Sequence, residues 1–224
     1  LVQKARETLG VKVISAWGMT ECGAITTTLI SDEDERSYNT DGVALPGVEI
    51  KITNKQGQQK AVNEAGRLMI RSCSSFGGYL KRSHLNDTDQ DDWFDTGDIA
   101  YQDEQGYIRI CGRKKDVIIR GGENIPVAEI ESLLYKHPNI AVIAIVAYPD
   151  ERLGERACAI VKLKDPTQQL QFADMVEFLK THNLAMQYIP ERLEIWDEIP
   201  MTPSGKIQKF KLRDLLLKST ESVT

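Results

Sequence analysis

The chain has 224 residues, of which 41% are hydrophobic and 27% carry a charge, and its formal net charge is −5. This length and composition suffice for one large domain or two smaller domains with buried cores. The acidic balance, without a sustained basic stripe, argues against a nucleic acid or an anionic membrane as the main partner and favours a small molecule or a protein.

The 4 cysteines and 3 histidines lie far apart and form no C-x-x-C pair. Isolated residues of these types are more often core or surface residues than metal ligands. We therefore expect neither a metal site built from these residues nor a disulfide framework. This cysteine pattern is typical of a protein in a reducing cytosol. No run approaches the roughly 20 apolar residues of a membrane span, so a cytoplasmic protein is expected.

The N-terminal half has the pattern of a β-rich region. Residues 1–4 carry neither an initiator methionine nor a signal-peptide pattern, and residues 11–16 predict a buried strand that enters from an earlier part of a domain. An acidic loop is expected at 31–36. Short β-prone runs between glycines then predict a small β-barrel or sandwich, with strands at 48–53, 67–71 and 107–111. The aspartates of 87–92 lack the other ligands of a calcium loop and predict a solvated loop.

The C-terminal half has a different pattern. Pro126 at a first helical position, followed by Val127, Ile130 and Leu134, predicts an amphipathic helix over 126–135. Further apolar patterns predict helices at 172–179 and 210–217 and strands at 142–147, 157–163 and 192–196. Together they indicate a compact α+β unit of about a hundred residues, with a small antiparallel sheet flanked by helices. The boundary is expected within 112–116.

Five short polar motifs occur along the chain. They are Trp17-Gly18-Met19-Thr20-Glu21, Trp93-Phe94-Asp95-Thr96-Gly97-Asp98, Gly112-Arg113-Lys114-Lys115-Asp116, Gly121-Gly122-Glu123-Asn124-Ile125 and Pro203-Ser204-Gly205-Lys206. Their order and spacing resemble the adenylate-forming superfamily of acyl-CoA synthetases, aryl-CoA ligases, luciferases and peptide-synthetase adenylation domains. The Arg-Gly-Gly-Glu-Asn run and residues 150–155 look most similar to bacterial short- or medium-chain fatty acyl-CoA and cyclohexanecarboxylate-CoA ligases.

The resemblance implies both a fold and a reaction. Residues 1–112 would be the C-terminal part of a large adenylation domain with a small distorted β-barrel, and residues 113–224 a mobile α+β domain. A carboxylic acid would react with ATP to give an acyl-adenylate and pyrophosphate, and CoA would then displace AMP to give the thioester. ATP/AMP, Mg²⁺ and CoA are the implied cofactors and co-substrates, and a fatty or alicyclic acid is the implied substrate.

The first motif would then bind the nucleotide. Trp17 could stack on adenine beside Gly18, Thr20 could hydrogen-bond the α-phosphate, and Glu21 could hold Mg²⁺, which prefers oxygen ligands. The alternative is a buried aromatic residue followed by a polar strand exit. Most relatives have Tyr where this chain has Trp17, a change that keeps a stacking face.

The next three motifs imply ribose contacts, a hinge and a thiol channel. Asp98 would accept hydrogen bonds from the ribose hydroxyls and Arg113 would reach the same region, although a turn carboxylate and a surface cation are the ordinary alternatives. Lys115 would be the hinge about which the small domain swings. Gly121 and Gly122 would allow close approach of a pantetheine arm, or simply form a β-turn.

Lys206 is the candidate with the clearest chemistry. An ammonium placed between an anionic carboxylate and an anionic triphosphate would stabilise the charge that develops during adenylation. Taken alone, a lysine after a turn is most often a solvated surface residue. The glycines that a Walker loop needs before Gly205-Lys206 are absent from the sequence.

Two differences from the family qualify these expectations. The chain has Gly66-Arg67 where the family usually has Gly-Glu, and the family's phosphate loop and most of its acyl pocket would precede Leu1. The chain alone is therefore expected to be inactive. The alternatives are an aryl-CoA ligase, an adenylation domain that loads a carrier protein, or a non-catalytic nucleotide- or CoA-binding module. A phosphate loop in the preceding sequence would favour an enzyme over a binding module.

Overall fold

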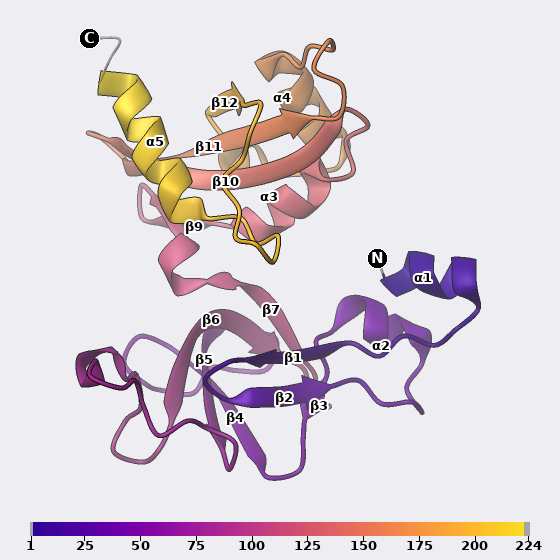
Figure 1. Cartoon of the computed structure of the whole chain (residues 1–224), viewed down its shortest axis with the longest axis vertical. Coiled ribbons are helices and arrows are strands. Elements are labelled where there is room, and N and C mark those ends of the chain that lie inside the picture. The colour runs from indigo at the N-terminus through magenta and orange to yellow at the C-terminus, as the bar shows by residue number, and fades with distance from the viewer. Residues whose placement is uncertain (1, 222–224) are drawn as a thin grey trace. The chain divides into compact units, whose positions relative to one another are not determined.

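The computed structural model describes residues 2–221, which divide into two compact units between Lys114 and Lys115 (Figure 1). We call the part up to Lys114 unit 1 and the part from Lys115 unit 2. Within the described residues, no helix combines the length and the apolar character that crossing a membrane requires.

Unit 1 consists of two antiparallel sheets and short helices. The helices are α1 (Val2–Leu9), α2 (Asp34–Asn39) and the single 3₁₀ turn η1 (Ser83–Leu85). The smaller sheet has the order β1 (Ala16–Met19), β2 (Gly23–Thr27), β3 (Val43–Ala44). The larger sheet has the order β4 (Val48–Thr53), β5 (Gly66–Ser72), β6 (Phe94–Gln102), β7 (Ile108–Arg113).

One hydrophobic cluster joins the two sheets of unit 1. Cys22 and Ile25 enter it from the β1–β2 hairpin, while Leu68 and Ile70 enter it from β5, and all four are fully buried. Burial of such side chains stabilises a fold by about 1.5–3 kcal/mol each. The hairpin that carries the first motif is therefore fixed on the larger sheet.

Three expectations for unit 1 need correction. Residues 11–15 form no strand, since pairing in the hairpin starts at Ala16, and Val11 and Ile14 are exposed. The expected loop at 31–36 runs into α2, whose first-turn acids Asp34 and Glu35 suit a helix N-terminus. The described strands form two open sheets rather than a closed barrel.

Unit 2 is a mixed sheet with helices on both faces. The 3₁₀ turn η2 (Lys114–Asp116) spans the boundary between the units, and a further such turn, η3 (Met186–Tyr188), lies within unit 2. Its strands are β8 (Ile118–Arg120), β9 (Glu123–Ile125), β10 (Ile140–Asp150), β11 (Gly154–Leu163) and β12 (Arg192–Ile195), and its helices α3 (Val127–Leu134), α4 (Phe172–Thr181) and α5 (Lys209–Glu221). The sheet order is β10-β11-β8-β9, with β12 beside β11. Because β12 runs parallel to β11, the expectation of a wholly antiparallel sheet was wrong.

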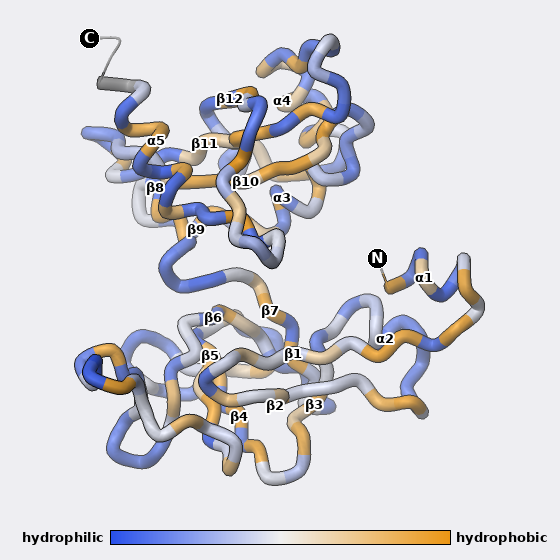
Figure 2. The backbone as a smooth tube through the Cα atoms, in the orientation of Figure 1, coloured by the Kyte–Doolittle hydropathy of each residue, from blue (hydrophilic) through white to orange (hydrophobic). Residues whose placement is uncertain are grey.

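Both faces of the β10–β11 pair are buried, which explains why its sequence is an almost continuous apolar run (Figure 2). Ile143 and Ile145 point into the cluster that contains α3 and α4, whereas Ala144 and Val146 point into the cluster that contains α5. Figure 1 shows α5 and α3 on opposite faces of these strands. The three helices expected in this half are present, and the two long strands extend beyond their expected ends.

Candidate active site

The first motif occupies the end of β1 and the tight turn into β2. The Cys22 N–H donates to the Met19 carbonyl at 3.2 Å, which closes the turn and leaves Thr20 exposed. A Cβ atom at Gly18 would lie 2.2 Å from the Gly23 carbonyl oxygen. Glycine is therefore required at position 18 by packing within the hairpin, independently of any ligand.

Trp17 lies inside β1 and is half-buried. Its ring packs against the cluster that joins the two sheets. The structure therefore gives this side chain a packing role along part of its surface. Stacking of Trp17 on adenine stays a prediction for the part that remains exposed.

Glu21 is held by a loop far away in the sequence. The Tyr79 hydroxyl donates to Glu21 Oε1 at 2.5 Å, and the Phe76 N–H donates to the Glu21 carbonyl oxygen at 2.7 Å. The hydrogen bond to Glu21 is the largest reason why the pKa of Tyr79 is raised. The sequence analysis missed Tyr79, for which the aromatic and glycine residues of 76–79 were the available signal.

Asp98 and Arg113 meet across the β6–β7 pair. They are direct partners in the strand register, and Arg113 Nε lies 2.9 Å from Asp98 Oδ1. Asp98 is 3% exposed, whereas half of the Arg113 side chain is accessible. The structure thus brings together the two residues predicted to contact ribose.

Cys22 shows that Glu21 and Asp98 belong to one region of unit 1. Burial raises the pKa of the Cys22 thiol, and the negative charges of Glu21 and Asp98 raise it further. These charges act through space, so both carboxylates lie near the same sulfur. Asp98 itself is buried and paired with Arg113, so its carboxylate does not add an exposed negative charge to this region.

The carboxylates of this region suit a Mg²⁺ ion that is bound mainly by the phosphates of a nucleotide. The described part of the chain contains no group of three or more His, Cys, Asp or Glu residues placed to hold a metal. Mg²⁺ commonly binds through one or two carboxylates while phosphates and water supply its remaining ligands. A single carboxylate such as that of Glu21 suits this mode.

A second charged cluster surrounds Asp95, in the same motif as Asp98. Asp95 Oδ2 accepts hydrogen bonds from both Nε and Nη2 of Arg67, and Lys114 Nζ lies 3.4 Å from the same oxygen. Burial acts to raise the pKa of Asp95, but the Arg67 hydrogen bonds, the Gly97 N–H and the charges of Arg67 and Lys114 hold it below its ordinary value. Arg67, the residue that departs from the family pattern, therefore has a defined partner.

The predicted hinge and glycine pair lie around the start of unit 2. Lys115 is exposed within η2, at the boundary between the units. Gly121 and Gly122 form the exposed turn between β8 and β9, with φ angles of +58° and +91°. Residues other than glycine rarely adopt these angles, so the turn requires both glycines whether or not a ligand approaches.

Lys206 lies on an exposed turn that precedes α5. The Lys206 N–H donates to Thr202 Oγ1 at 3.0 Å, and the Thr202 N–H donates to the Lys206 carbonyl at 2.8 Å. The Gly205 N–H donates to the Thr202 carbonyl at 2.9 Å. These bonds fix the backbone and leave the lysine side chain in solvent, as a mobile cationic group would require.

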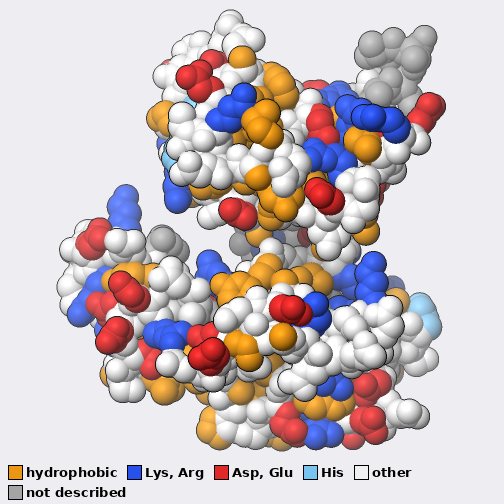
Figure 3. Space-filling view, turned by 180° about the vertical axis from the view of Figure 1, so that it is seen from behind, with side chains coloured by type: hydrophobic (Ala, Val, Ile, Leu, Met, Phe, Trp, Pro, Cys, Tyr) orange, Lys and Arg blue, Asp and Glu red, His pale blue; other side chains and the backbone are white. Residues whose placement is uncertain are grey.

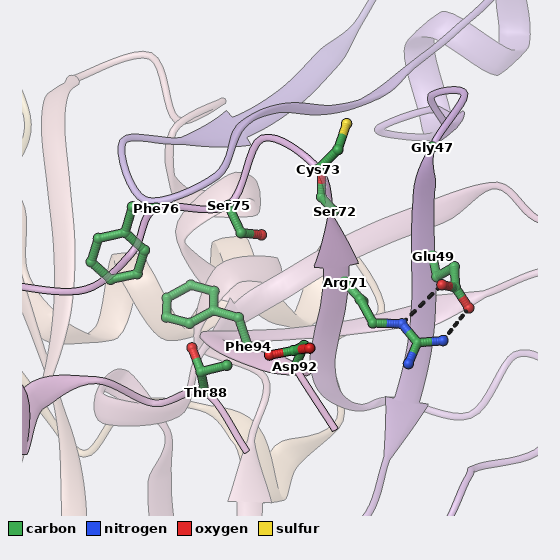
Figure 4. A pocket seen from close by; sticks show the side chains of 10 residues that line it. All are labelled: Gly47, Glu49, Arg71, Ser72, Cys73, Ser75, Phe76, Thr88, Asp92 and Phe94. Atoms are coloured by element: carbon green, nitrogen blue, oxygen red, sulfur yellow. Dashed lines mark hydrogen bonds and ion pairs between the residues drawn. The ribbon is translucent and has the colours of Figure 1, made fainter. Parts of the chain in front are cut away.

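A pocket of about 450 Å³ opens in unit 1 near the end of β5 (Figure 4). Arg71 forms a two-point ion pair with Glu49 on one side, and the rings of Phe76 and Phe94 pack edge to face on the other, with centroids 5.6 Å apart. Phe94 belongs to the second motif, but none of the residues to which the motifs assign a catalytic or binding role lines the pocket. It is nevertheless adjacent to the site, since the Phe76 N–H donates to the Glu21 carbonyl.

Charges on the visible surface of each unit are mixed. On the face turned to the viewer in Figure 3, Lys and Arg side chains alternate with Asp and Glu side chains in both units. This face therefore carries no extended surface of one sign that would attract a polyelectrolyte.

Two family models match the chain, and together they cover more than half of it. The model described as AMP-binding enzyme matches residues 1–80, and the model described as AMP-binding enzyme C-terminal domain matches residues 129–206. The two matches lie in unit 1 and unit 2, in that order.

Characterised relatives and solved structures extend the same similarity. Over 96% of its length the chain is 40% identical to a medium-chain fatty-acid–CoA ligase of Escherichia coli (strain K12), of which it covers 38%. Over 93% it is 35% identical to enterobactin synthase component E of the same organism, of which it covers 39%. The crystal structure of ATP-bound MatB from Rhodopseudomonas palustris matches 96% of the chain with a TM-score of 0.86 and 28% identity, and 42% of that protein is covered. The chain thus spans about two fifths of the length of these proteins.

Proposed function

The chain belongs to the AMP-binding enzyme family, and on that premise we propose that its protein activates a carboxylic acid with ATP and transfers the acyl group to CoA. The observation that carries the proposal is the 40% identity to a medium-chain fatty-acid–CoA ligase over 96% of the chain. Membership of this family does not determine which acid is activated or which molecule accepts the acyl group. The experiments below therefore test the acid and the acceptor.

In the proposed first step, a carboxylate oxygen of the substrate attacks the α-phosphorus of ATP. The new P–O bond gives the acyl-adenylate, and the bond to pyrophosphate breaks. The two reactants are both anionic, so the barrier falls when a cation lies between them. We assign this role to the ammonium of Lys206, whose turn is exposed and closed by its own backbone hydrogen bonds.

Residues of unit 1 would hold the nucleotide during this step. Asp98 and Arg113, which form an ion pair, would orient the ribose, and Thr20 on the exposed turn would donate to the α-phosphate. Glu21 would bind the Mg²⁺ that accompanies ATP, an ion that neutralises phosphate charge. The hydrogen bond from Tyr79 engages Oε1 and would orient the carboxylate toward the ion.

In the proposed second step, the CoA thiol loses its proton and attacks the acyl carbonyl carbon, and AMP leaves. We propose that unit 2 swings about Lys115 between the steps and brings the Gly121-Gly122 turn to the thiol channel. Lys115→Pro would restrict the backbone at the hinge and slow this step more than adenylation. An unchanged CoA step in this variant would remove Lys115 from the hinge role.

The proposed acid is a fatty or alicyclic carboxylic acid, and an aryl acid loaded onto a carrier protein is the second candidate. Similarity to a medium-chain ligase favours the first, and the 35% identity to an enterobactin synthase component keeps the second open. A panel of aliphatic, alicyclic and aromatic acids should be assayed with the full-length protein, once with CoA and once with a phosphopantetheinylated carrier. Thioester formation with CoA and aliphatic acids supports the proposal, whereas product with aryl acids and the carrier alone supports the alternative.

A non-catalytic nucleotide- or CoA-binding module is the remaining alternative. Pyrophosphate exchange into ATP that depends on added acid distinguishes the two, because a binding module does not catalyse it. The chain of 224 residues by itself is proposed to lack this activity, as it spans 38% of the medium-chain ligase. Measurable exchange by the isolated chain would contradict that part of the proposal.

A further inference from the structure

The linker around Lys115 is bound on both sides by charged side chains. Lys114 Nζ contacts Asp95 of unit 1 at 3.4 Å. Arg213 Nη2, on α5 of unit 2, donates to the Lys115 carbonyl at 3.0 Å and to Asp116 Oδ1 at 2.6 Å. Lys114 therefore contacts a residue of unit 1, whereas the next residue, Lys115, accepts a hydrogen bond from unit 2.

The helix α5 that carries Arg213 is packed against the sheet of unit 2. The neighbours of Arg213 on this helix, Leu212 and Leu216, are fully buried and fix α5 against the β10–β11 pair. Near the start of the helix, Lys209 Nζ pairs with Glu131 Oε1 of α3 at 2.7 Å. The guanidinium has a planar array of donors and can bind a carbonyl and a carboxylate at once from this fixed base.

The same helix is continuous with the Lys206 turn. The Gln208 N–H donates to the Pro200 carbonyl at 2.9 Å, and Met201 pairs with Ile207 across the base of the turn. The linker, α5 and the Lys206 turn are thus joined within unit 2 by a short series of hydrogen bonds.

We propose that Arg213 is a positioning residue, which binds the linker to α5 so that Lys206 and residues 115–116 move as one body. Asp95 holds Lys114 on the other side, so rotation is confined to the link between Lys114 and Lys115. This inference rests on the proposed function, since it assigns Arg213 to the domain swing of that reaction. It requires no contact of Arg213 with substrate.

Hydrogen exchange in the full-length protein tests the attachment directly, whatever its activity. Arg213→Met should raise the exchange rate of the backbone amides of 114–120 about tenfold, the scale of a lost hydrogen bond to a charged group. Lys211→Met, on the same helix and exposed, is the matched control and should leave these amides unchanged. Asp116→Asn should add little to Arg213→Met, because both remove the same interaction.

The outcomes separate three explanations. Faster exchange confined to 114–120, with about fivefold lower kcat in both half-reactions and an unchanged KM for ATP, supports the positioning role. Equal acceleration along all of α5 and β10 would reduce Arg213 to a structural residue, and unchanged exchange at 114–120 would overturn the inference. Absence of acid-dependent exchange in the wild-type protein would refute the proposed function instead, while the amide data would still decide whether Arg213 holds the linker.

Discussion

The turn that carries Glu21 and the turn that carries Lys206 are held in different ways. Around Glu21, the neighbouring Cys22 is fully buried in the core and Tyr79 binds the carboxylate from 58 residues further along the chain. Around Lys206, the backbone bonds come from Thr202 only four residues away, and the side chain is exposed. The Glu21 turn is therefore held by contacts with the core and with a distant loop. The Lys206 turn is held by local hydrogen bonds.

This difference predicts how substitutions act. Changes near Glu21 should alter stability and activity together, because the same contacts serve both. Changes at Lys206 should alter activity alone, because its side chain makes no packing contribution that folding would lose. The following predictions, ordered from the largest effect to the smallest, test this contrast.

Lys206→Ala in the full-length protein should lower acid-dependent pyrophosphate exchange about 10²–10³-fold, the usual effect of losing one group that stabilises the transition state. The free energy of unfolding should change by less than about 0.5 kcal/mol, since the side chain is exposed. Urea denaturation and the exchange assay measure the two quantities, with Lys211→Ala as the control. A large loss of stability would show that Lys206 contributes to folding, as the residues around Glu21 do, and would contradict the proposed difference between the two turns.

Gly18→Ala should lower stability together with activity, unlike Lys206→Ala. The added Cβ would lie 2.2 Å from the Gly23 carbonyl oxygen, so the hairpin must distort. We expect a loss of about 3 kcal/mol in the free energy of unfolding, the upper range for overpacking. Gly77→Ala is the control, since nothing lies within 4 Å of its added Cβ. Equal stability of the two variants in urea denaturation would contradict the claim that packing within the hairpin requires glycine at position 18.

Tyr79→Phe removes the hydroxyl that donates to Glu21 and keeps the ring, whose centroid lies 4.9 Å from that of Phe76. Stability should fall by about 1 kcal/mol, the net value of a typical hydrogen bond. The KM for MgATP should rise as well, because Glu21 loses the hydrogen bond that orients its carboxylate. A change in stability with an unchanged KM would separate Glu21 from metal binding.

The pH dependence of stability should distinguish the two units. In unit 2, burial lowers the pKa of His137 below its ordinary value of 6.5, so its contribution is complete above that pH and is lost as pH falls through the folded-state pKa. In unit 1, Asp95 has a pKa below its ordinary 3.8, so its contribution is lost only at more acidic pH. His137→Gln should flatten the decline that starts below pH 6.5 in thermal unfolding, and an unaltered profile would exclude His137 as its origin.

The sequence predicted the elements whose burial is periodic. The helix α3 and the strands β10 and β11 follow from residues that alternate between core and surface, or from runs buried on both faces. The strand β6 was not predicted, because its Thr-Gly-Asp run has the composition of a turn. The resemblance assigned Asp98 and Arg113 to the same ribose region, and the β6–β7 register shows that they are direct partners.

Other features of the site depend on contacts that no local pattern encodes. Tyr79 reaches Glu21 across 58 positions, and Arg67 reaches Asp95 across 28. Both pairs arise from strand pairing and loop placement in unit 1. A departure such as Gly66-Arg67 is visible in the sequence, but its compensating carboxylate is identified only by the fold.

The central claim is that Lys206 serves adenylation from an independent turn, and the thioester half-reaction tests it most directly. The full-length Lys206→Ala protein should be given a preformed acyl-adenylate and CoA, and the rate of thioester formation compared with that of the wild type. The proposed role predicts a rate within about threefold of the wild type, although exchange has fallen by 10²–10³-fold. Equal loss of both half-reactions would contradict it.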